Sequence, residues 1–334
     1  MSKKTVALGA IAALAAGAAA PAIAQQQING SGASFPAPMF ATWFDSLRNQ
    51  DGPNVTYEPV NSAQGIRQLV ELEVDFGATD RPMAPRTANL VRRGLVQIPV
   101  VAGSIAIGYN KDGCDLKLSQ QQLSEVLLGT INNWKTLGCQ EGPIKVSTRS
   151  DRSGTTLALT KSLSDWSPEF RQTVGTSMRV KFPVGTTSSG NEGVRRFIET
   201  TPGSIGYVNV PSIKGKVQAA ALQNSEGNYM LPNSATGISA LEGIRAAEYK
   251  PLAISNPPGR DSYPLVAMSW VLAYENGNGV NTDALKQTFN YMLSNPAQSQ
   301  ADNLGYVPLP ESIRKAALDQ VQLIKQRSAE REHS

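Results

Sequence analysis

The run LVQIPVVAGSIAIGY, residues 95–109, is the part of this sequence that decides the fold. It contains two apolar segments rich in Val and Ile, 95–101 and 104–109, and short runs of this kind are typical of buried strands. Ala102 and Gly103 separate the two segments, and a glycine inside a strand pattern often marks a bend. The run therefore predicts two strands that meet at a hinge.

Segments with helical and with strand periodicity alternate on both sides of this run. Phe40, Trp43, Phe44 and Leu47 recur at helical spacing after two prolines that suit a first helical turn, and 54–57 alternates like a strand. Such alternation predicts an α/β fold with mostly parallel sheets, in which ligands bind at the carboxyl ends of strands against helix N-termini. Further helices are expected at 66–73, 119–128, 154–165, 190–200, 237–247, 282–294 and 310–327, with further strands near 74–78, 144–148, 204–209 and 264–274.

The first 24 residues have the features of an export signal. Lys3 and Lys4 precede an Ala-rich apolar run, which ends in small residues at the positions that a signal peptidase reads. An uncleaved membrane anchor is the alternative, and the weakly apolar composition of the run disfavours it. We expect cleavage near Ala24 and a mature periplasmic chain that begins near Gln25.

Charge and hydropathy exclude two classes of partner. The 31 basic and 27 acidic residues give a net charge of +4, which falls to 29 against 27, or +2, once Lys3 and Lys4 are removed. So small a charge does not indicate a nucleic-acid partner. No later segment has the roughly 18 consecutive apolar residues that a membrane span needs, so we expect the exported protein to be soluble.

Cys114 and Cys139 are the only two cysteines of the sequence. In a chain sent to an oxidising compartment, an even number of cysteines predicts a disulfide bond. Neither cysteine lies near the cleavage site, so neither is placed to carry a lipid anchor there.

Three small polar turns each stand just before an expected helix: SGASFP at 31–36, NSAQG at 61–65 and RSGTT at 152–156. Ser62 and Ser153 are expected to be the N-caps of their helices. A helix start exposes unpaired amide groups and about half a positive charge, so it can bind an oxyanion together with a nearby hydroxyl. If the three turns converge, they form a cage for an anion; otherwise they are ordinary caps.

Several motifs together resemble one family, the periplasmic phosphate-binding proteins (PstS family) of bacterial high-affinity phosphate ABC importers. The similarity covers essentially the whole mature chain, and its motifs occur in the family's order. They are SGASFPAP at 31–38, NSAQGIRQL at 61–69, VDFGATDRPM at 74–83, STRSDRSGTT at 147–156, GNEGV at 190–194, PGSIGYV at 202–208 and GYVPLPESI at 305–313.

The resemblance implies a two-lobed periplasmic binding protein of type II, in which the chain crosses twice between the lobes and the ligand lies in the interdomain cleft. Lobe one would comprise 26–101 plus 267–334, and lobe two 102–266. The first crossing then coincides with the hinge expected at Ala102 and Gly103. The implied partners are inorganic phosphate and the permease subunits of the transporter, with no cofactor, and we expect a monomer.

The family's ligand residues carry over onto matching positions of this sequence. The implied phosphate-binding residues are Ser34, Phe35, Ser62, Asp80, Arg149, Ser153, Gly154 and Thr155. Serine and threonine side chains would supply hydroxyl donors, the residues at the turns would supply backbone amides, and Arg149 would supply charge and a planar fork of donors. Asp151 is expected to support that fork from the side.

Asp80 is informative because an ionised carboxylate can only accept hydrogen bonds. Phosphate near neutral pH carries one or two protons, whereas sulfate carries none. Sulfate would leave the carboxylate of Asp80 unpaired and repelled, at a cost of several kcal/mol. A capping or turn aspartate is the alternative interpretation of this residue.

Two departures from the family pattern leave questions open. Arg152 stands where relatives often have glycine, and its guanidinium either steers anions at the cleft mouth or lies in solvent. The turn at 61–65 has less Gly and Ser than is common in relatives, so its donors are less defined.

Other chemistries find little support in the sequence. The only histidine, His333, lies in the charged tail, so a Ser-His-Asp hydrolase lacks a base, and neither a Walker loop nor a cluster of metal ligands is present. We therefore expect a non-enzymatic binding protein. A secreted phosphatase-like enzyme and a phosphate sensor built on the same fold remain the alternatives.

Overall fold

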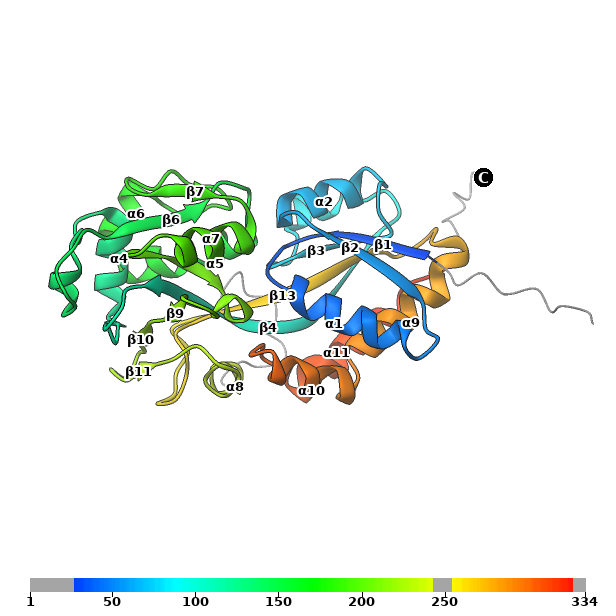
Figure 1. Cartoon of the computed structure of the whole chain (residues 1–334). Helices are drawn as coiled ribbons and strands as arrows, with labels where there is room; N and C mark the ends of the chain where they lie inside the picture. The colour runs from blue at the N-terminus through cyan, green and yellow to red at the C-terminus, as the bar shows by residue number, and fades with distance from the viewer. Residues whose placement is uncertain (1–26, 243–253, 327–334) are drawn as a thin grey trace, which may run out of the picture.

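The computed structural model describes residues 27–242 and 254–326. The expected export signal, its cleavage site, the end of the 237–247 helix and the tail with His333 lie outside the described residues. The described chain forms two lobes joined by long strands (Figure 1). One sheet passes through both lobes in the order β2-β1-β3-β13-β4-β8-β6-β7.

Strand β4 (Leu95–Asn110) runs from the first lobe into the second without a break (Figure 1). It pairs antiparallel with β13 (Leu265–Tyr274) and then with β8 (Ser204–Asn209). The predicted division into two strands is wrong, because the ladder continues through Gly103, which lies opposite Ala267. Glycine suits the tight packing there: a Cβ would lie 3.0 Å from the ring of Phe35, so the ring would have to shift by a few tenths of an ångström.

The first lobe places three parallel strands beside β13: β3 (Phe76–Thr79), β1 (Gln27–Gly32) and β2 (Asn54–Pro59). The apolar face of its first helix buries Phe40, Trp43, Phe44 and Leu47, as the helical spacing predicted. The helices of this lobe are α1 (Ala37–Arg48), α2 (Ser62–Val70), α3 (Pro85–Ala88), α9 (Thr282–Met292), α10 (Asn295–Asn303) and α11 (Glu311–Gln322).

The second lobe is built around β8, β6 (Lys145–Arg149) and β7 (Thr186–Ser188), which are parallel to one another. A small separate sheet contains β5 (Lys117–Leu118), β10 (Ala221–Gln223) and β11 (Tyr229–Met230). Two short strands extend the main sheet: β9 (Gln218–Ala219) pairs with β4, and β12 (Ile254–Ser255) pairs with β13. The helices of this lobe are α4 (Gln120–Leu128), α5 (Gly154–Trp166), α6 (Pro168–Thr173), α7 (Gly190–Thr200) and α8 (Ser234–Glu242).

The α/β fold class is confirmed, but the sheet is mixed rather than mostly parallel. The outer strands of each lobe are parallel, whereas β4 and β13 are antiparallel to each other because one leaves the first lobe and the other returns to it. Strand β1, with the sequence QINGSG, was not predicted because it lacks an apolar run.

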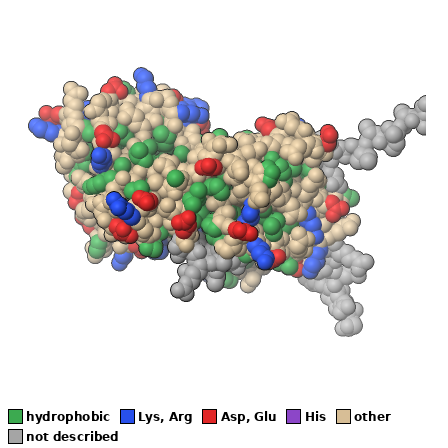
Figure 2. All heavy atoms as spheres, turned by 90° about the horizontal axis from the view of Figure 1, so that it is seen from below, with side chains coloured by type: hydrophobic (Ala, Val, Ile, Leu, Met, Phe, Trp, Pro, Cys, Tyr) green, Lys and Arg blue, Asp and Glu red, His purple; other side chains and the backbone are tan. Residues whose placement is uncertain are grey.

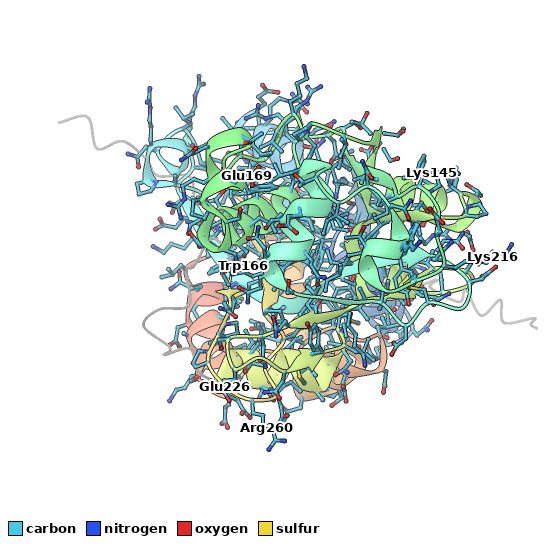
Figure 3. The ribbon with its side chains drawn as sticks, turned by 90° about the vertical axis from the view of Figure 1, so that its left-hand side faces the viewer. Lys145, Trp166, Glu169, Lys216, Glu226 and Arg260 are labelled. Atoms are coloured by element: carbon cyan, nitrogen blue, oxygen red, sulfur yellow. A yellow bond between two sulfur atoms is a disulfide. The ribbon has the colours of Figure 1, made fainter. Side chains whose placement is uncertain are left out.

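The outer end of the second lobe carries ordinary solvated charges. Figure 3 shows Lys145 and Lys216 pointing outward, with Trp166 at the same end. Trp43, Trp134 and Trp270 are fully buried, so these three are core residues. On the face of the molecule seen in Figure 2, acidic and basic side chains are interspersed and no broad patch of one sign occurs. Within the described ranges, no helix combines the length and apolar character needed to cross a bilayer.

The predicted disulfide joins Cys114 and Cys139 across 25 residues of sequence. Replacing both cysteines with serine is expected to lower the free energy of unfolding by about 3 kcal/mol, because the unfolded chain loses a covalent constraint. Denaturant unfolding at equal pH would measure the change. Neither cysteine belongs to the polar turns that are expected to bind an anion, so anion affinity serves as the control and should stay unchanged. An unaltered unfolding midpoint would contradict the prediction.

Candidate anion-binding site between the lobes

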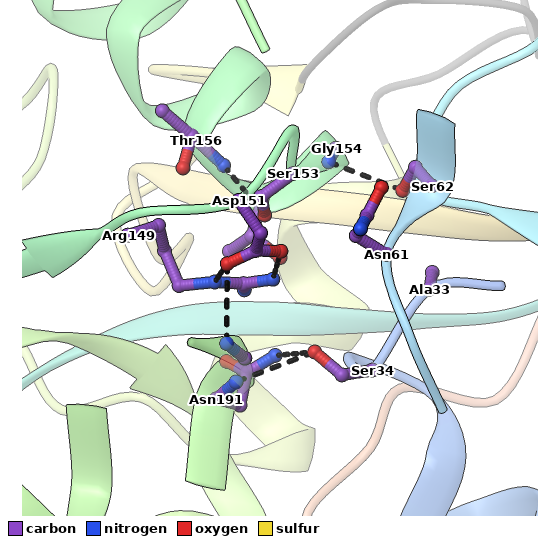
Figure 4. A network of polar contacts seen from close by, with 12 residues as sticks. Ala33, Ser34, Asn61, Ser62, Arg149, Asp151, Ser153, Gly154, Thr156 and Asn191 are labelled. Atoms are coloured by element: carbon purple, nitrogen blue, oxygen red, sulfur yellow. Dashed lines mark hydrogen bonds and ion pairs between the residues drawn. The ribbon is translucent and has the colours of Figure 1, made fainter. Parts of the chain in front are cut away.

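Polar segments of both lobes meet where the two lobes face each other (Figure 4). The first lobe contributes the turns after β1 and β3 and the start of α2. The second lobe contributes the turn after β6 and the starts of α5 and α7. Each segment follows the carboxyl end of a strand or begins a helix, which is where ligands bind in folds of this class. The three polar turns therefore converge, as the cage hypothesis required.

Hydrogen bonds across the cleft hold the lobes closed. The amide of Gly154 donates to Ser62 Oγ over 3.1 Å, and the hydroxyl of Thr155 donates to Asp80 Oδ2 over 3.1 Å. Gly154 must be glycine, because a Cβ there would lie 2.7 Å from the Cβ of Asp80. The start of α5 and the turn after β3 are thus in direct backbone contact.

A second bridge across the cleft involves Ser34. Its hydroxyl oxygen accepts from the amide of Asn191 at 3.3 Å and from Asn191 Nδ2 at 3.1 Å. The side chain of Asn191 also accepts from the backbone amide of Asn209 at 3.0 Å. Asn191 therefore links the turn after β1 to the core of the second lobe, although no sequence pattern indicates this role.

Asp80 lies at the centre of the site and is only 2% exposed. Besides Thr155, the hydroxyl of Ser269 donates to its Oδ1 at 3.0 Å. Burial raises the pKa of Asp80 to about 6, although these two hydrogen bonds and the charge of Arg149 act in the opposite direction. Asp80 is thus a buried acceptor that is mostly ionised above pH 6.

Arg149 is held by Asp151 in a fork-to-fork pair, as expected from the sequence. Its Nε donates to Asp151 Oδ1 at 2.7 Å, and a terminal nitrogen donates to Oδ2. Burial opposes ionisation of Asp151, but the hydrogen bonds and charge of Arg149 and the amide of Gly190, at 3.1 Å, lower its pKa overall. Two of the five donors of a guanidinium are occupied by this pair, and the others remain for a ligand.

The backbone of Arg149 is fixed as well. The hydroxyl of Tyr207 accepts from the Arg149 amide at 3.1 Å and lies 2.8 Å from the hydroxyl of Thr156. Tyr207 is fully buried on β8. It therefore joins the end of β6 to the first turn of α5. The sequence around Tyr207 predicted only a strand and gave no sign of this role for its hydroxyl.

The capping predictions have different outcomes. Ser153 is the N-cap of α5 and accepts from the amide of Thr156 at 3.2 Å, which confirms the prediction. Ser62 is not a cap: Asn61 caps α2 and accepts from the amide of Gln64 at 2.9 Å, and Ser62 is the first helical residue. An asparagine is an equally good cap, and its use frees the hydroxyl of Ser62 to reach the second lobe.

Phe35 packs its ring in the core, edge to face with Tyr306 at a centroid distance of 6.0 Å. Its carbonyl accepts from Asn209 Nδ2 of the second lobe at 2.8 Å. The buried ring of Phe35 thus fixes the position of the turn that contains Ser34. A cavity of about 420 Å³ lies beside this turn and is lined from both lobes, including Ser34, Asn191 and Asn209.

The chemistry of this site suits a tetrahedral oxyanion that carries a proton. Arg149 and two helix starts supply positive charge and donors, while buried Asp80 supplies an acceptor. Among the described residues, no group of three or more His, Cys, Asp or Glu side chains is placed to hold a metal ion.

Comparisons with known proteins identify the family of this chain. Residues 17–296 match the family model described as PBP superfamily domain. The phosphate-binding protein PstS of Pasteurella multocida is 33% identical over 304 residues, which cover 86% of this chain and 88% of that protein. The PstS of Haemophilus influenzae is 34% identical over 303 residues, covering 86% and 90%.

Solved structures show the same fold at lower identity. The high affinity periplasmic phosphate-binding protein PfluDING, solved with bound phosphate, has a TM-score of 0.73 and 19% identity, covering 87% of this chain and 92% of that one. The phosphate binding protein of Stenotrophomonas maltophilia has a TM-score of 0.69 and 22% identity, covering 88% and 93%. By its sequence matches over most of its length, this chain belongs to the PstS family of phosphate-binding proteins, within the PBP superfamily.

Proposed function

We propose that this protein binds inorganic phosphate in the periplasm and delivers it to the membrane permease of a phosphate ABC transporter. Family membership supports the transport role, and the relatives named above are phosphate-binding proteins. The phosphate ligands are the residues expected from the sequence: Ser34, Phe35, Ser62, Asp80, Arg149, Ser153, Gly154 and Thr155. Asp151 acts through Arg149 and does not itself contact the anion.

The observation that carries the proposal is a buried carboxylate, Asp80, in a site otherwise made of donors. Its two oxygens accept from Thr155 and Ser269, and Arg149 is close enough to affect its ionisation. An ionised Asp80 requires a ligand that can donate a proton, which phosphate does and sulfate does not. The site is therefore selective for a protonated oxyanion.

The division into lobes fits this role. We propose that 26–101 with 267–334 moves against 102–266 about the crossings in β4 and β13. Opening separates Ser62 from Gly154 and Ser34 from Asn191, and closure around the ligand excludes water from it. The protein acts as a monomeric receptor in this scheme, after removal of the export signal near Ala24.

Isothermal titration of the mature protein with phosphate, arsenate and sulfate tests the function. At pH 8 we expect phosphate to bind at least about a hundredfold more tightly than sulfate. Sulfate can bind only when Asp80 is protonated. Because the pKa of Asp80 is about 6, only about 1% of the protein molecules carry this proton at pH 8. Sulfate affinity should therefore rise about tenfold for each pH unit from 8 towards 6.

Arsenate is the positive control, because it is tetrahedral and also carries a proton near neutral pH. Equal affinity for phosphate and sulfate at pH 8 would overturn the assigned role of Asp80. Absence of phosphate binding would overturn the function itself. Release of p-nitrophenol from p-nitrophenyl phosphate would instead favour the phosphatase-like alternative, and a pull-down of permease subunits separates transport from sensing.

A further inference from the structure

A second hollow, of about 620 Å³, lies at the mouth of the cleft. Its lining includes three arginines, of which Arg67 and Arg81 come from the first lobe and Arg152 from the second. Asn61, Gln64 and Thr87 add amide and hydroxyl groups. The amide of Ala63 donates to the carbonyl of Arg152 at 3.3 Å, so the two lobes touch at this hollow.

Two of the three guanidinium groups lack a compensating charge. Arg67 pairs with Glu71 and with Glu73, the latter at 3.1 Å, so its charge is balanced. Neither Arg81 nor Arg152 forms an ion pair with any of the residues the structure describes, 27–242 and 254–326. The Nε of Arg81 is buried and has no hydrogen-bond partner there, and its terminal nitrogen reaches only the carbonyl of Pro82, at 3.5 Å.

Arg81 and Arg152 also act on each other. Burial, and then the charge of Arg152, lower the pKa of Arg81, which means that the two cations repel across the closed cleft. No carboxylate is found among the described residues that line the hollow. Closing the lobes thus brings two unbalanced positive charges together, and an anion between them would remove the repulsion.

We infer that Arg81 and Arg152, with Asn61, Gln64 and Thr87, form a second oxyanion site that bridges the lobes at the cleft mouth. The inference does not depend on phosphate occupying the central site. Guanidinium and side-chain amide groups can donate to any oxyanion, and no acceptor here is restricted to a protonated ligand. The mouth site therefore takes sulfate as well as phosphate, in contrast to the site at Asp80.

The position of the site gives it a role in closure. Arg81 directly follows Asp80, and Arg152 directly precedes the N-cap of α5, Ser153. An anion held between the two arginines favours the closed arrangement of the central site. An incoming anion can also be held there before it reaches the centre, since charged clefts concentrate their ligands.

Titration with sodium sulfate at pH 8 tests the site, because the central site rejects sulfate at that pH. Backbone amide chemical shifts are recorded for the full mature chain, with sodium chloride added to keep the ionic strength constant. We expect saturable shifts near residues 61–64, 81 and 152. Arg152→Gln, and separately Arg81→Gln, should weaken sulfate binding at least about tenfold.

Lys216→Gln is the matched control, because it removes one positive charge from the outer end of the same lobe (Figure 3). It should leave sulfate binding unchanged. Equal effects of Arg152→Gln and Lys216→Gln, or shifts that grow linearly without saturation, would overturn the mouth site. Shifts centred on Ser34 and Arg149 instead would also overturn it, because sulfate would then enter the central site. Arg152 is exposed, so its variant should fold even if the Arg81 variant does not.

Phosphate titration of the same proteins separates this inference from the proposed function. If phosphate and sulfate both shift only residues 61–64, 81 and 152 of the wild-type protein, and phosphate causes no shifts at Ser34, Arg149 or Thr155, the proposed function is overturned and the mouth site stands. Normal phosphate binding with no saturable sulfate response would do the reverse.

Discussion

Replacing Asp80 with asparagine is expected to reduce the preference for phosphate over sulfate about a hundredfold at pH 8. The asparagine amide can donate to an unprotonated oxyanion, so sulfate no longer needs a protonated protein. The hydroxyls of Ser269 and Thr155 can rotate to suit the new group, which keeps the site satisfied. Titration calorimetry with both anions between pH 6 and 8 should also show that the pH dependence of sulfate binding has disappeared.

Unfolding experiments provide an independent check on Asp80. Its folded-state pKa of about 6 is raised above the ordinary value near 4, so ionisation destabilises the empty fold as pH rises through this window. Asp80→Asn should therefore be more stable than wild type by about 2–3 kcal/mol at pH 8, and the difference should vanish below pH 4. Asp45→Asn, on the exposed side of α1, is the matched control. If the Asp80→Asn protein still prefers phosphate over sulfate a hundredfold at pH 8, the role given to Asp80 is ruled out.

Replacing Arg149 with glutamine is expected to weaken phosphate binding about a thousandfold, or about 4 kcal/mol. The change removes the main cation of the site and leaves the carboxylates of Asp80 and Asp151 facing the anion. It also leaves Asp151 buried without its partner, which lowers the free energy of unfolding. Phosphate titration and denaturant unfolding measure the two effects separately.

The double variant Arg149→Gln with Asp151→Asn distinguishes binding from folding. It removes both buried charges, so most of the lost stability should return while phosphate binding stays weak. Asp151→Asn alone keeps the cation but not the paired fork, and a loss of about tenfold is expected from misorientation. Recovery of phosphate affinity in the double variant would show that Arg149 acts on stability and not on the ligand.

Much of the fold follows from local patterns. The periodicity of Phe40, Trp43 and Phe44 was enough to predict α1, and the strand predicted near 204–209 matches β8. The polar strand β1 and the unbroken course of β4 could not be predicted in this way. Both depend on partners distant in sequence. Strand β1 pairs with β2 and β3, and the glycine within β4, Gly103, leaves room for the rings of Phe35 and Tyr306.

The residues of the candidate site also fall into those that local sequence patterns predict and those that only long-range packing brings into place. Residues in turns before helices, such as Ser34, Ser153 and Gly154, were predictable because their type and position reveal exposed amides and hydroxyls. Asn191 and Ser269 were not, since an asparagine in a first helical turn and a serine within an apolar strand have no local signature of a ligand site. Only the packing of β13 against the end of β3 brings Ser269 to Asp80.

In the receptor proposed above, the paired strands β4 and β13 are the connection about which the lobes would move during phosphate exchange. They are bonded to each other from Leu95 opposite Tyr274 to Ser104 opposite Val266, so the lobes can part by twisting a two-stranded ribbon that keeps its ladder intact. In the proposed opening, the bonds broken between the lobes belong to turns and helix starts, such as Gly154 to Ser62 and Ala63 to Arg152, and the β4–β13 ladder stays formed. We therefore expect unloading to occur on the microsecond to millisecond timescale of domain hinges, with no segment that must refold.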